Sequence, residues 1–160
     1  MIEFKTVRYK NFLSTGQQFI EVPLNTGGTT LIIGDNGSGK STMLDALCFG
    51  LFNRPFRDIK KDQIVNSINE KDCLVEIDLQ IGSNNYTIKR GIKPAIFEIW
   101  CNDKMLNQDA ASKDYQKHLE DNILRLNFRS FTQVVILGSS SFVPFMRLRA
   151  RHRRQVVEEI

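Results

Sequence analysis

Alternating apolar and polar positions predict an antiparallel sheet in the first two thirds of the chain. The extended segments are residues 1–13, 17–24, 73–81, 86–90 and 95–101. Within residues 73–81 the apolar side chains face one way, while Glu76 and Asp78 face the other way, towards water. Residues 82–85 form a turn between this segment and the next. The pattern predicts an antiparallel meander with one solvated face.

Two apolar runs that do not alternate predict buried strands. Residues 29–33 (TTLII) and 131–137 (FTQVVIL) are short and rich in β-branched side chains. A strand that is covered on both faces has this composition, because neither side of it meets water. We therefore expect both segments to lie inside a sheet.

Helical periodicity marks three further segments. After residue 40, apolar side chains recur at i, i+3, i+4 and i+7, which predicts one buried stripe made of Leu44, Leu47, Cys48 and Leu51. Ser112 is placed to cap a second helix that runs to about Leu126. Residues from about 148 also read as a helix and reach residue 160 without a stop signal, which predicts a chain cut within that helix.

A glycine-rich loop joins the first apolar run to the helix after it. Its sequence, GDNGSGKS, fits the P-loop pattern, in which glycines bring backbone N–H groups onto phosphate oxygens and the following helix adds further donors. Lys40 is expected to reach the β- and γ-phosphates, Ser41 to ligate Mg²⁺ and Thr42 to support the α-phosphate. The nucleotide-binding residues predicted in the loop are Asn36, Gly37, Ser38, Gly39, Lys40, Ser41 and Thr42.

The rest of the chain does not complete a site for phosphoryl transfer. It has no NKxD motif of the kind that reads the base in GTPases, and no buried strand ends in an acidic residue. Phosphoryl transfer needs a group that positions the nucleophile as well as a phosphate grip. The sequence therefore predicts that this chain alone is inactive as an ATPase.

Charge and cysteine content further limit the classes of protein to which this chain can belong. The net charge is +4, and the last 14 residues hold five arginines against two glutamates, so the basic excess belongs to one end. Three scattered cysteines predict neither a disulfide framework nor a zinc site, and indicate a reducing compartment. No apolar run approaches the roughly 18 residues of a membrane span, and the first residues do not resemble a signal peptide.

These segments together resemble the amino-terminal half of an ABC-type ATPase head. The resemblance rests on RYKNFLS (8–14), GDNGSGKSTMLDALCFGLF (34–52) and the order of the later segments, and it spans essentially the whole chain. The chain is similar to the SMC/SbcC class of double-strand-break-repair ATPases, in the branch that serves T-even-type phage recombination endonucleases. The implied fold is an α/β P-loop lobe over residues 1–146, with a mixed sheet and an antiparallel meander. Residues 147–160 would begin a coiled-coil helix.

The resemblance also implies ligands and partners. The cofactors would be ATP and Mg²⁺, with Walker B and the signature motif supplied by a carboxy-terminal lobe of the same ATPase. A second ATPase head would form an ATP-dependent homodimer, and a metallophosphoesterase-type nuclease subunit would act on double-stranded DNA ends. ATP-driven dimerisation of the heads would gate processing of those ends. The expected location is the cytoplasm, which is the bacterial host's if the chain is phage-encoded.

Several residues outside the loop gain roles from the same resemblance. Lys10 and Asn11 match family positions near the base and phosphates of the nucleotide. The position of the glutamine that helps to hold Mg²⁺ in the family corresponds either to Gln133 or, by alignment of the apolar run, to Gly138 or Ser139, where the Ser139 hydroxyl or a backbone group would take its place.

Two basic clusters are candidates for DNA contact. Arg54, Arg57, Lys60 and Lys61 follow the P-loop helix, and Arg147, Arg151 and Arg154 would share one face if residues 147–160 are helical. Such clusters can track phosphates without reading sequence, although charge runs are more often solvated surface, and the arginines could also couple the ATPase heads.

Two other functions fit the same motifs. One is a DNA-organising lobe of the SMC or RecF type without a nuclease partner. The other is a small self-contained P-loop kinase or NTPase, against which the missing acidic strand end counts.

Overall fold

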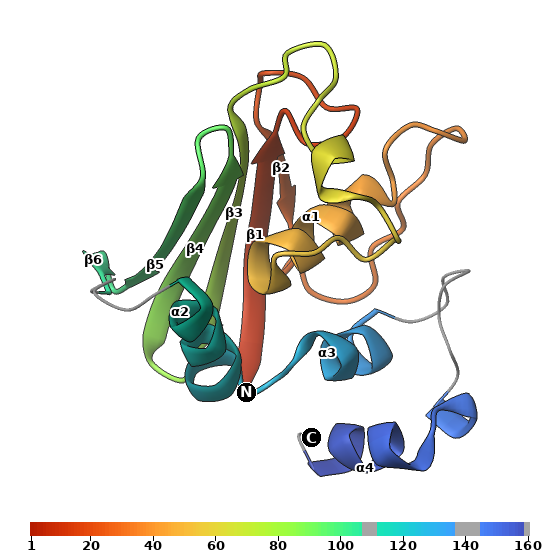
Figure 1. Cartoon of the computed structure of the whole chain (residues 1–160), viewed down its shortest axis with the longest axis vertical. Coiled ribbons are helices and arrows are strands. Elements are labelled where there is room, and N and C mark those ends of the chain that lie inside the picture. The colour runs from red at the N-terminus through yellow and green to blue at the C-terminus, as the bar shows by residue number, and fades with distance from the viewer. Residues whose placement is uncertain (107–111, 137–144, 159–160) are drawn as a thin grey trace. The chain divides into compact units, whose positions relative to one another are not determined.

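A six-stranded antiparallel sheet forms the centre of the first of two units (Figure 1). The computed structural model describes residues 1–106, 112–136 and 145–158, and the chain divides into units of residues 1–109 and 110–160. The strands are β1 (Ile2–Lys10), β2 (Ile20–Pro23), β3 (Cys73–Ile81), β4 (Asn84–Ile92), β5 (Ile96–Cys101) and β6 (Lys104–Met105). Their order is β2-β1-β3-β4-β5-β6, which confirms the predicted hairpin and meander.

The register of the strands aligns a row of branched apolar side chains across the sheet. Val7 of β1 pairs with Ile77 of β3, Ile77 pairs with Ile88 of β4, and Ile88 pairs with Ile99 of β5. All four side chains are fully buried. Burial of side chains of this size typically contributes about 1.5–3 kcal/mol each, so this row anchors the core.

Helix α1 (Thr42–Phe52) packs against β1, β3 and β4. Every residue from Asp45 to Phe52 is buried, rather than one stripe only, so the predicted stripe was too narrow. The sheet covers one side of the helix, while Phe12 contacts Phe49 and Arg57 binds Asp45. Asn53 ends the helix in the left-handed region (φ 58°) and donates its N–H to the carbonyl of Phe49.

The opposite face of the sheet carries a row of charges. Arg8 donates to Glu76, and Lys89 lies 3.4 Å from the same carboxylate. Glu76 was expected to face water, yet it is buried, because the two cations of the neighbouring strands cover it. Asp78 is half-buried and accepts a hydrogen bond from Thr87.

The second unit is helical. Its elements are α2 (Ser112–His118), the π-helical turn η2 (Leu119–Leu124), α3 (Phe128–Val134), the 3₁₀ turn η3 (Phe145–Arg147) and α4 (Ala150–Glu158). Tyr115, Leu119 and Ile123 are buried, whereas Leu126 is half-buried. The run that begins at Ser112 ends near the predicted Leu126, with Arg125 in the left-handed region.

Two predictions of buried strands are wrong. Residues 29–33 form no strand, and Leu31 and Ile33 are 80% and 83% exposed. A segment forms a β-strand only if another strand pairs with its backbone, whatever its apolar content. Within the described residues no strand pairs with residues 29–33. Residues 128–134 form α3 instead of a strand, because the Asn127 side chain accepts hydrogen bonds from the N–H groups of Arg129 and Ser130 and starts a helix.

The last helix begins later than expected. Arg147 belongs to η3, whereas Arg151 and Arg154 belong to α4, so the prediction that all three share one helix face is wrong. Leu148 donates its N–H to the carbonyl of Phe145 in a tighter turn, which changes the angular spacing of the side chains. The predicted helix itself is present from Ala150.

Candidate functional site: a phosphate-binding loop and its pocket

The P-loop turns through two glycines in the left-handed region. Gly37 has a φ of 85° and Gly39 a φ of 94°, values that L-amino acids with side chains rarely adopt. Ser38 donates its N–H to the carbonyl of Asp35, and Thr42 donates to that of Gly39. The loop therefore leads directly into α1, and the helix N-terminus faces the space that the loop encloses.

The side chain of Lys40 forms hydrogen bonds within the P-loop. Its ammonium donates to the carbonyl of Asp35 at 2.7 Å and also to that of Gly34. The predicted role of this ammonium is to reach phosphate oxygens. It lies within the loop that would hold them, and its present partners are neutral carbonyls, which a phosphate can replace with a stronger charge-assisted bond.

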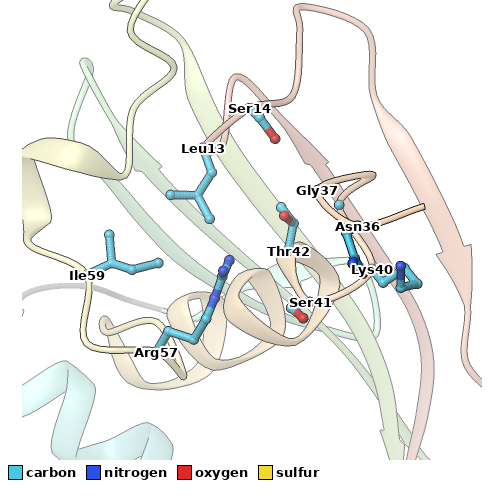
Figure 2. A pocket seen from close by; sticks show the side chains of 10 residues that line it. Leu13, Ser14, Asn36, Gly37, Lys40, Ser41, Thr42, Arg57 and Ile59 are labelled. Atoms are coloured by element: carbon cyan, nitrogen blue, oxygen red, sulfur yellow. The ribbon is translucent and has the colours of Figure 1, made fainter. Parts of the chain in front are cut away.

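A pocket of about 400 Å³ opens beside the loop (Figure 2). Its residues come from three segments: the turn after β1, the P-loop with the start of α1, and the loop after α1. They are Leu13, Ser14, Asn36, Gly37, Gly39, Lys40, Ser41, Thr42, Arg57 and Ile59. Six of the seven predicted loop residues line it, and Ser38 does not.

The pocket has a polar end and a less polar end. Figure 2 shows Ser41 and Thr42 at the start of α1, with Leu13 and Ile59 reaching in from other segments. Hydroxyls, an amide and an ammonium surround the end at the P-loop, whereas Leu13 and Ile59 contribute aliphatic surface. Ser14 and Arg57 line the pocket on the side of Leu13 and Ile59, so that side combines aliphatic surface with a hydroxyl and a guanidinium.

Arg57 belongs to the pocket, although its sequence position indicated a DNA contact. Its Nε donates to Oδ2 of Asp45 at 2.7 Å, and its backbone N–H donates to Oδ1 at 2.9 Å. Asp45 is fully buried, while the Arg57 side chain is 48% exposed. The ion pair fixes the start of the loop after α1 against the helix, so Arg57 points into the pocket (Figure 2).

Lys10 and Asn11 lie close to this pocket in sequence but do not line it. Asn11 is buried, accepts a hydrogen bond from the Asn69 side chain at 2.8 Å and donates to the carbonyl of Asp72. The ammonium of Lys10 lies 5.1 Å from the ring centre of Phe19. Contact of either residue with a nucleotide stays a prediction.

The remaining candidates are distributed over both units. Arg54, Lys60 and Lys61 are exposed in the loop after α1, and Arg147, Arg151 and Arg154 are exposed in the second unit. Gln133 lies in α3, where its side-chain oxygen is buried without a hydrogen-bond partner. Ser139 lies outside the described residues. The roles of these residues in binding DNA or Mg²⁺ stay predictions.

Sequence reasoning missed four residues of the site. Leu13 and Ser14 follow the strand end that drew attention to Lys10 and Asn11, and that position was the available signal. The sequence contains no signal that Ile59 and Asp45 belong to the site, because an aliphatic residue in a loop and an acidic residue in the first turn of a helix are both common.

Among the described residues, burial and neighbouring groups shift the pKa of five titratable groups, among them Tyr86, whose pKa burial raises. Burial raises the pKa of Tyr9 and of the Cys73 thiol, the latter to about 12, and burial with Asp45 raises that of Cys48. In the second unit, desolvation and the neighbouring arginines at positions 129, 149 and 151 lower the pKa of His152. At neutral pH both thiols are therefore protonated, which agrees with their role as packed side chains.

Mg²⁺ fits the polar end of the pocket. Ser41 lines the pocket and precedes α1, yet its hydroxyl makes no capping hydrogen bond with the helix and is available to a ligand. Hydroxyl and phosphate oxygens are the hard ligands that Mg²⁺ prefers. Across the part of the chain that the structure describes, no cluster of three His, Cys, Asp or Glu side chains could hold a metal ion unaided.

The match to a known family follows this geometry. The sequence profile of the family described as "AAA domain" matches residues 6–159. The chain belongs to the AAA domain family. This AAA domain is 47% identical over 154 residues to exonuclease subunit 2 of Enterobacteria phage T4, which covers 96% of the chain and 27% of the relative.

More distant relatives agree with the resemblance drawn from the motifs. The DNA double-strand break repair Rad50 ATPase of Sulfolobus acidocaldarius is 35% identical over 88 residues, covering 55% of this AAA domain and 10% of the relative. A solved Smc head domain from Pyrococcus yayanosii, with its coiled coil and joint, superposes with a TM-score of 0.64 at 22% identity. That superposition covers 99% of this chain and 32% of the other, and it confirms the P-loop head fold.

The AAA domain spans about a quarter of the length of the phage relatives that it matches. None of the helices in the described residues is both long and apolar enough to cross a membrane.

Proposed function

We propose that this chain is the amino-terminal, ATP-binding lobe of an ATPase subunit in a DNA recombination or repair nuclease complex. The observation that carries the proposal is the pocket itself, in which the P-loop glycines, Lys40 and Ser41 surround the polar end. The phage and Rad50 relatives, whose names describe an exonuclease subunit and a repair ATPase, support the choice of process.

The residues of the chain supply binding and charge neutralisation. The Lys40 ammonium exchanges its loop carbonyls for phosphate oxygens, while the free N–H groups at the start of α1 add donors. Ser41, through its hydroxyl, holds Mg²⁺, which would neutralise charge on the phosphates when bound. Asp45 keeps Arg57 in the pocket wall. Among the described residues of the pocket, none is an acid or base that could activate water.

Completion of the site therefore falls to other segments. A carboxy-terminal lobe of the same ATPase and a second head would supply the groups for hydrolysis, and dimerisation with ATP would gate nuclease access to DNA ends in the cytoplasm. Residues 147–160 would lead from residues 1–146 into a coiled coil. Lys60 and Lys61 are the exposed lysines nearest in sequence to the pocket, and we propose that they contact DNA phosphates.

A test of ATP turnover separates this function from its alternatives. We expect no turnover by the 160-residue chain alone, and turnover after a carboxy-terminal lobe is added, with loss of that turnover in Lys40→Ala. Turnover by the chain alone that disappears in Lys40→Ala would instead favour a self-contained kinase or NTPase. An SMC- or RecF-type lobe predicts turnover with the added lobe but no co-purifying nuclease activity from the complete complex.

A further inference from the structure

The wall of the pocket opposite the P-loop is a strained turn. Leu13 and Ser14 reach the pocket from the turn after β1, whereas Ser41 and Thr42 come from the start of α1 (Figure 2). Leu13 has a φ of 53°, in the left-handed region that disfavours residues with a Cβ. A leucine persists in this conformation only where the surrounding contacts determine it.

Hydrogen bonds within the turn account for part of that constraint. The Thr15 hydroxyl donates to the carbonyl of Phe12 at 2.7 Å and accepts from the N–H of Phe12 at 3.0 Å. Asn11 donates its N–H to the carbonyl of Gly16 at 2.8 Å, which closes the turn at its base. These bonds shape the turn but do not attach it to the rest of the pocket.

Attachment comes from a second loop, which contains Asn66. Leu13 donates its N–H to the carbonyl of Ile64 at 2.6 Å, and Asn66 donates its own N–H to the carbonyl of Asn11 at 2.9 Å. The side chain of Asn66 donates to the carbonyl of Thr15 at 3.1 Å. The turn is therefore held to the second loop on both sides of Leu13.

Asn66 uses both ends of its amide. While its nitrogen bonds Thr15, its oxygen accepts from the N–H groups of Ile68 at 2.9 Å and Asn69 at 3.0 Å, which fixes the second loop. The residue is 6% exposed and does not line the pocket. Asn66 therefore joins the turn after β1 to the loop after α1, and it can act on a ligand in the pocket only through these two segments.

We propose that Asn66 is a positioning residue for the nucleotide, because it holds Leu13 and Ser14 as the wall against which the nucleoside rests. The inference depends on the proposed ATP-binding function and deepens it. The phosphates occupy the end at Lys40 and Ser41, which leaves the aliphatic surface of Leu13 and Ile59 for the base and ribose. Loss of the Asn66 side-chain contact removes the bond to Thr15, while the backbone bonds from Leu13 to Ile64 and from Asn66 to Asn11 remain, so the wall is loosened on the side of Thr15 and the P-loop is unaltered.

Two ligands distinguish this role from a general structural one. We compare the affinity of the complete protein for Mg·ATP with that for inorganic tripolyphosphate and Mg²⁺, both measured by calorimetry. Asn66→Asp retains an oxygen for Ile68 and Asn69 but loses the donor to Thr15. We expect Asn66→Asp to weaken ATP binding about tenfold, because Leu13 and Ser14 are then less well ordered for contact with the nucleoside. Tripolyphosphate has no nucleoside, so its binding should weaken less than about twofold.

Two further variants test the wall itself and provide a control. Leu13→Gly keeps the left-handed backbone, which glycine adopts without strain, and removes the wall side chain, so it should show the same selective loss. If Asn66→Asp fails to fold, this variant decides the question. Asn102→Asp is the matched control, since Asn102 is exposed and its amide oxygen accepts from the N–H of Asn85 at 2.9 Å in the turn beyond β5, outside the pocket. It should leave both affinities unchanged.

Equal loss of both ligands in Asn66→Asp, or loss of neither, overturns the role of Asn66. Failure of the unmodified protein to bind either ligand overturns the proposed function instead. The two failures are therefore distinguishable in one experiment.

Discussion

At the scale of single residues, hydrogen bonds divide a cluster that looks uniform in the sequence. Arg57 is bound to the buried carboxylate of Asp45, so its guanidinium is held in the wall of the P-loop pocket. Lys60 and Lys61, three and four residues later, are exposed. Charge that is already neutralised by a buried partner contributes little to phosphate binding, while exposed lysines remain available to it.

Replacement of these two lysines should therefore change DNA binding by the complete protein. For Lys60→Ala with Lys61→Ala, the slope of log affinity against log salt should fall by about one per lost phosphate contact. Fluorescence anisotropy with duplex DNA over a salt series measures the slope. Lys104→Ala, an exposed lysine in β6, is the control. An unchanged slope in the double variant contradicts contact between this loop and DNA.

The same scale shows what a sequence can predict about a site. The P-loop glycines and the sequence of residues 40–42 were recognisable, because the phosphate grip is local and its chemistry dictates each residue type. The wall with Leu13 and Ile59 was not, because these residues are brought together by the fold and neither residue type is distinctive. The place of Arg57 in the pocket wall was not predictable either, since its partner, Asp45, lies twelve residues earlier and is hidden in α1, and contact of Arg57 with DNA stays a prediction.

At the scale of elements, the approach of α1 to the sheet depends on one glycine. A Cβ at Gly50 would lie 2.4 Å from Cδ1 of Ile77 and 3.2 Å from Cγ1 of Val75, both in β3. Ile77 and Val75 are fully buried, so neither side chain has room to move. The absence of a side chain at this position brings the helix that presents the phosphate grip into contact with the centre of the sheet.

Gly50→Ala should therefore destabilise the protein despite the better helix propensity of alanine. Overpacking a core costs about 1–3 kcal/mol, against a gain of about 0.5–1 kcal/mol from propensity. We expect a net loss of roughly 1–2 kcal/mol, because the closest contact is far inside van der Waals distance. Urea denaturation followed by circular dichroism measures it. Gly16→Ala, which meets no atom within 4 Å, should be nearly neutral, and equal stability of both variants would refute the argument.

Helices and strands were predictable from the sequence where apolar and polar residues alternate clearly. The prediction failed where they do not. β3 and β4 follow their patterns, because each needs one buried face. The β-branched composition of residues 131–137 predicts a strand. The Asn127 side chain instead caps the N-terminus of a helix, α3, which includes the first of these residues. A local hydrogen bond at the first turn thus outweighed a weak propensity that depends on context.

At the scale of the whole molecule, the exposed run at residues 29–33 is the main departure from expectation. Leu31, Ile32 and Ile33 are exposed in succession, and no described strand pairs with their backbone. Unpaired apolar segments associate with other chains when no native partner covers them. The predicted carboxy-terminal lobe is the partner that we propose for this segment.

The 160-residue chain should consequently self-associate, and Leu31→Ser with Ile33→Ser should increase the fraction of monomer. Analytical ultracentrifugation over a concentration series measures that fraction. Ile68→Ser removes a single apolar side chain that is equally exposed, and should have little effect because it is isolated. A monodisperse monomer of the unmodified chain would show that residues 29–33 need no partner.

The pairing of β1 with β3 has a consequence for how the molecule assembles. Among the described strands, β1–β2, β3–β4, β4–β5 and β5–β6 pair with neighbours in sequence, whereas β1 and β3 are separated by residues 11–72. Every residue of the pocket lies within that interval. Closing a long interval is slow compared with forming a hairpin. Helix α1, which presents the P-loop, packs on both β1 and β3, so we expect nucleotide affinity to appear during refolding only after these two strands have paired.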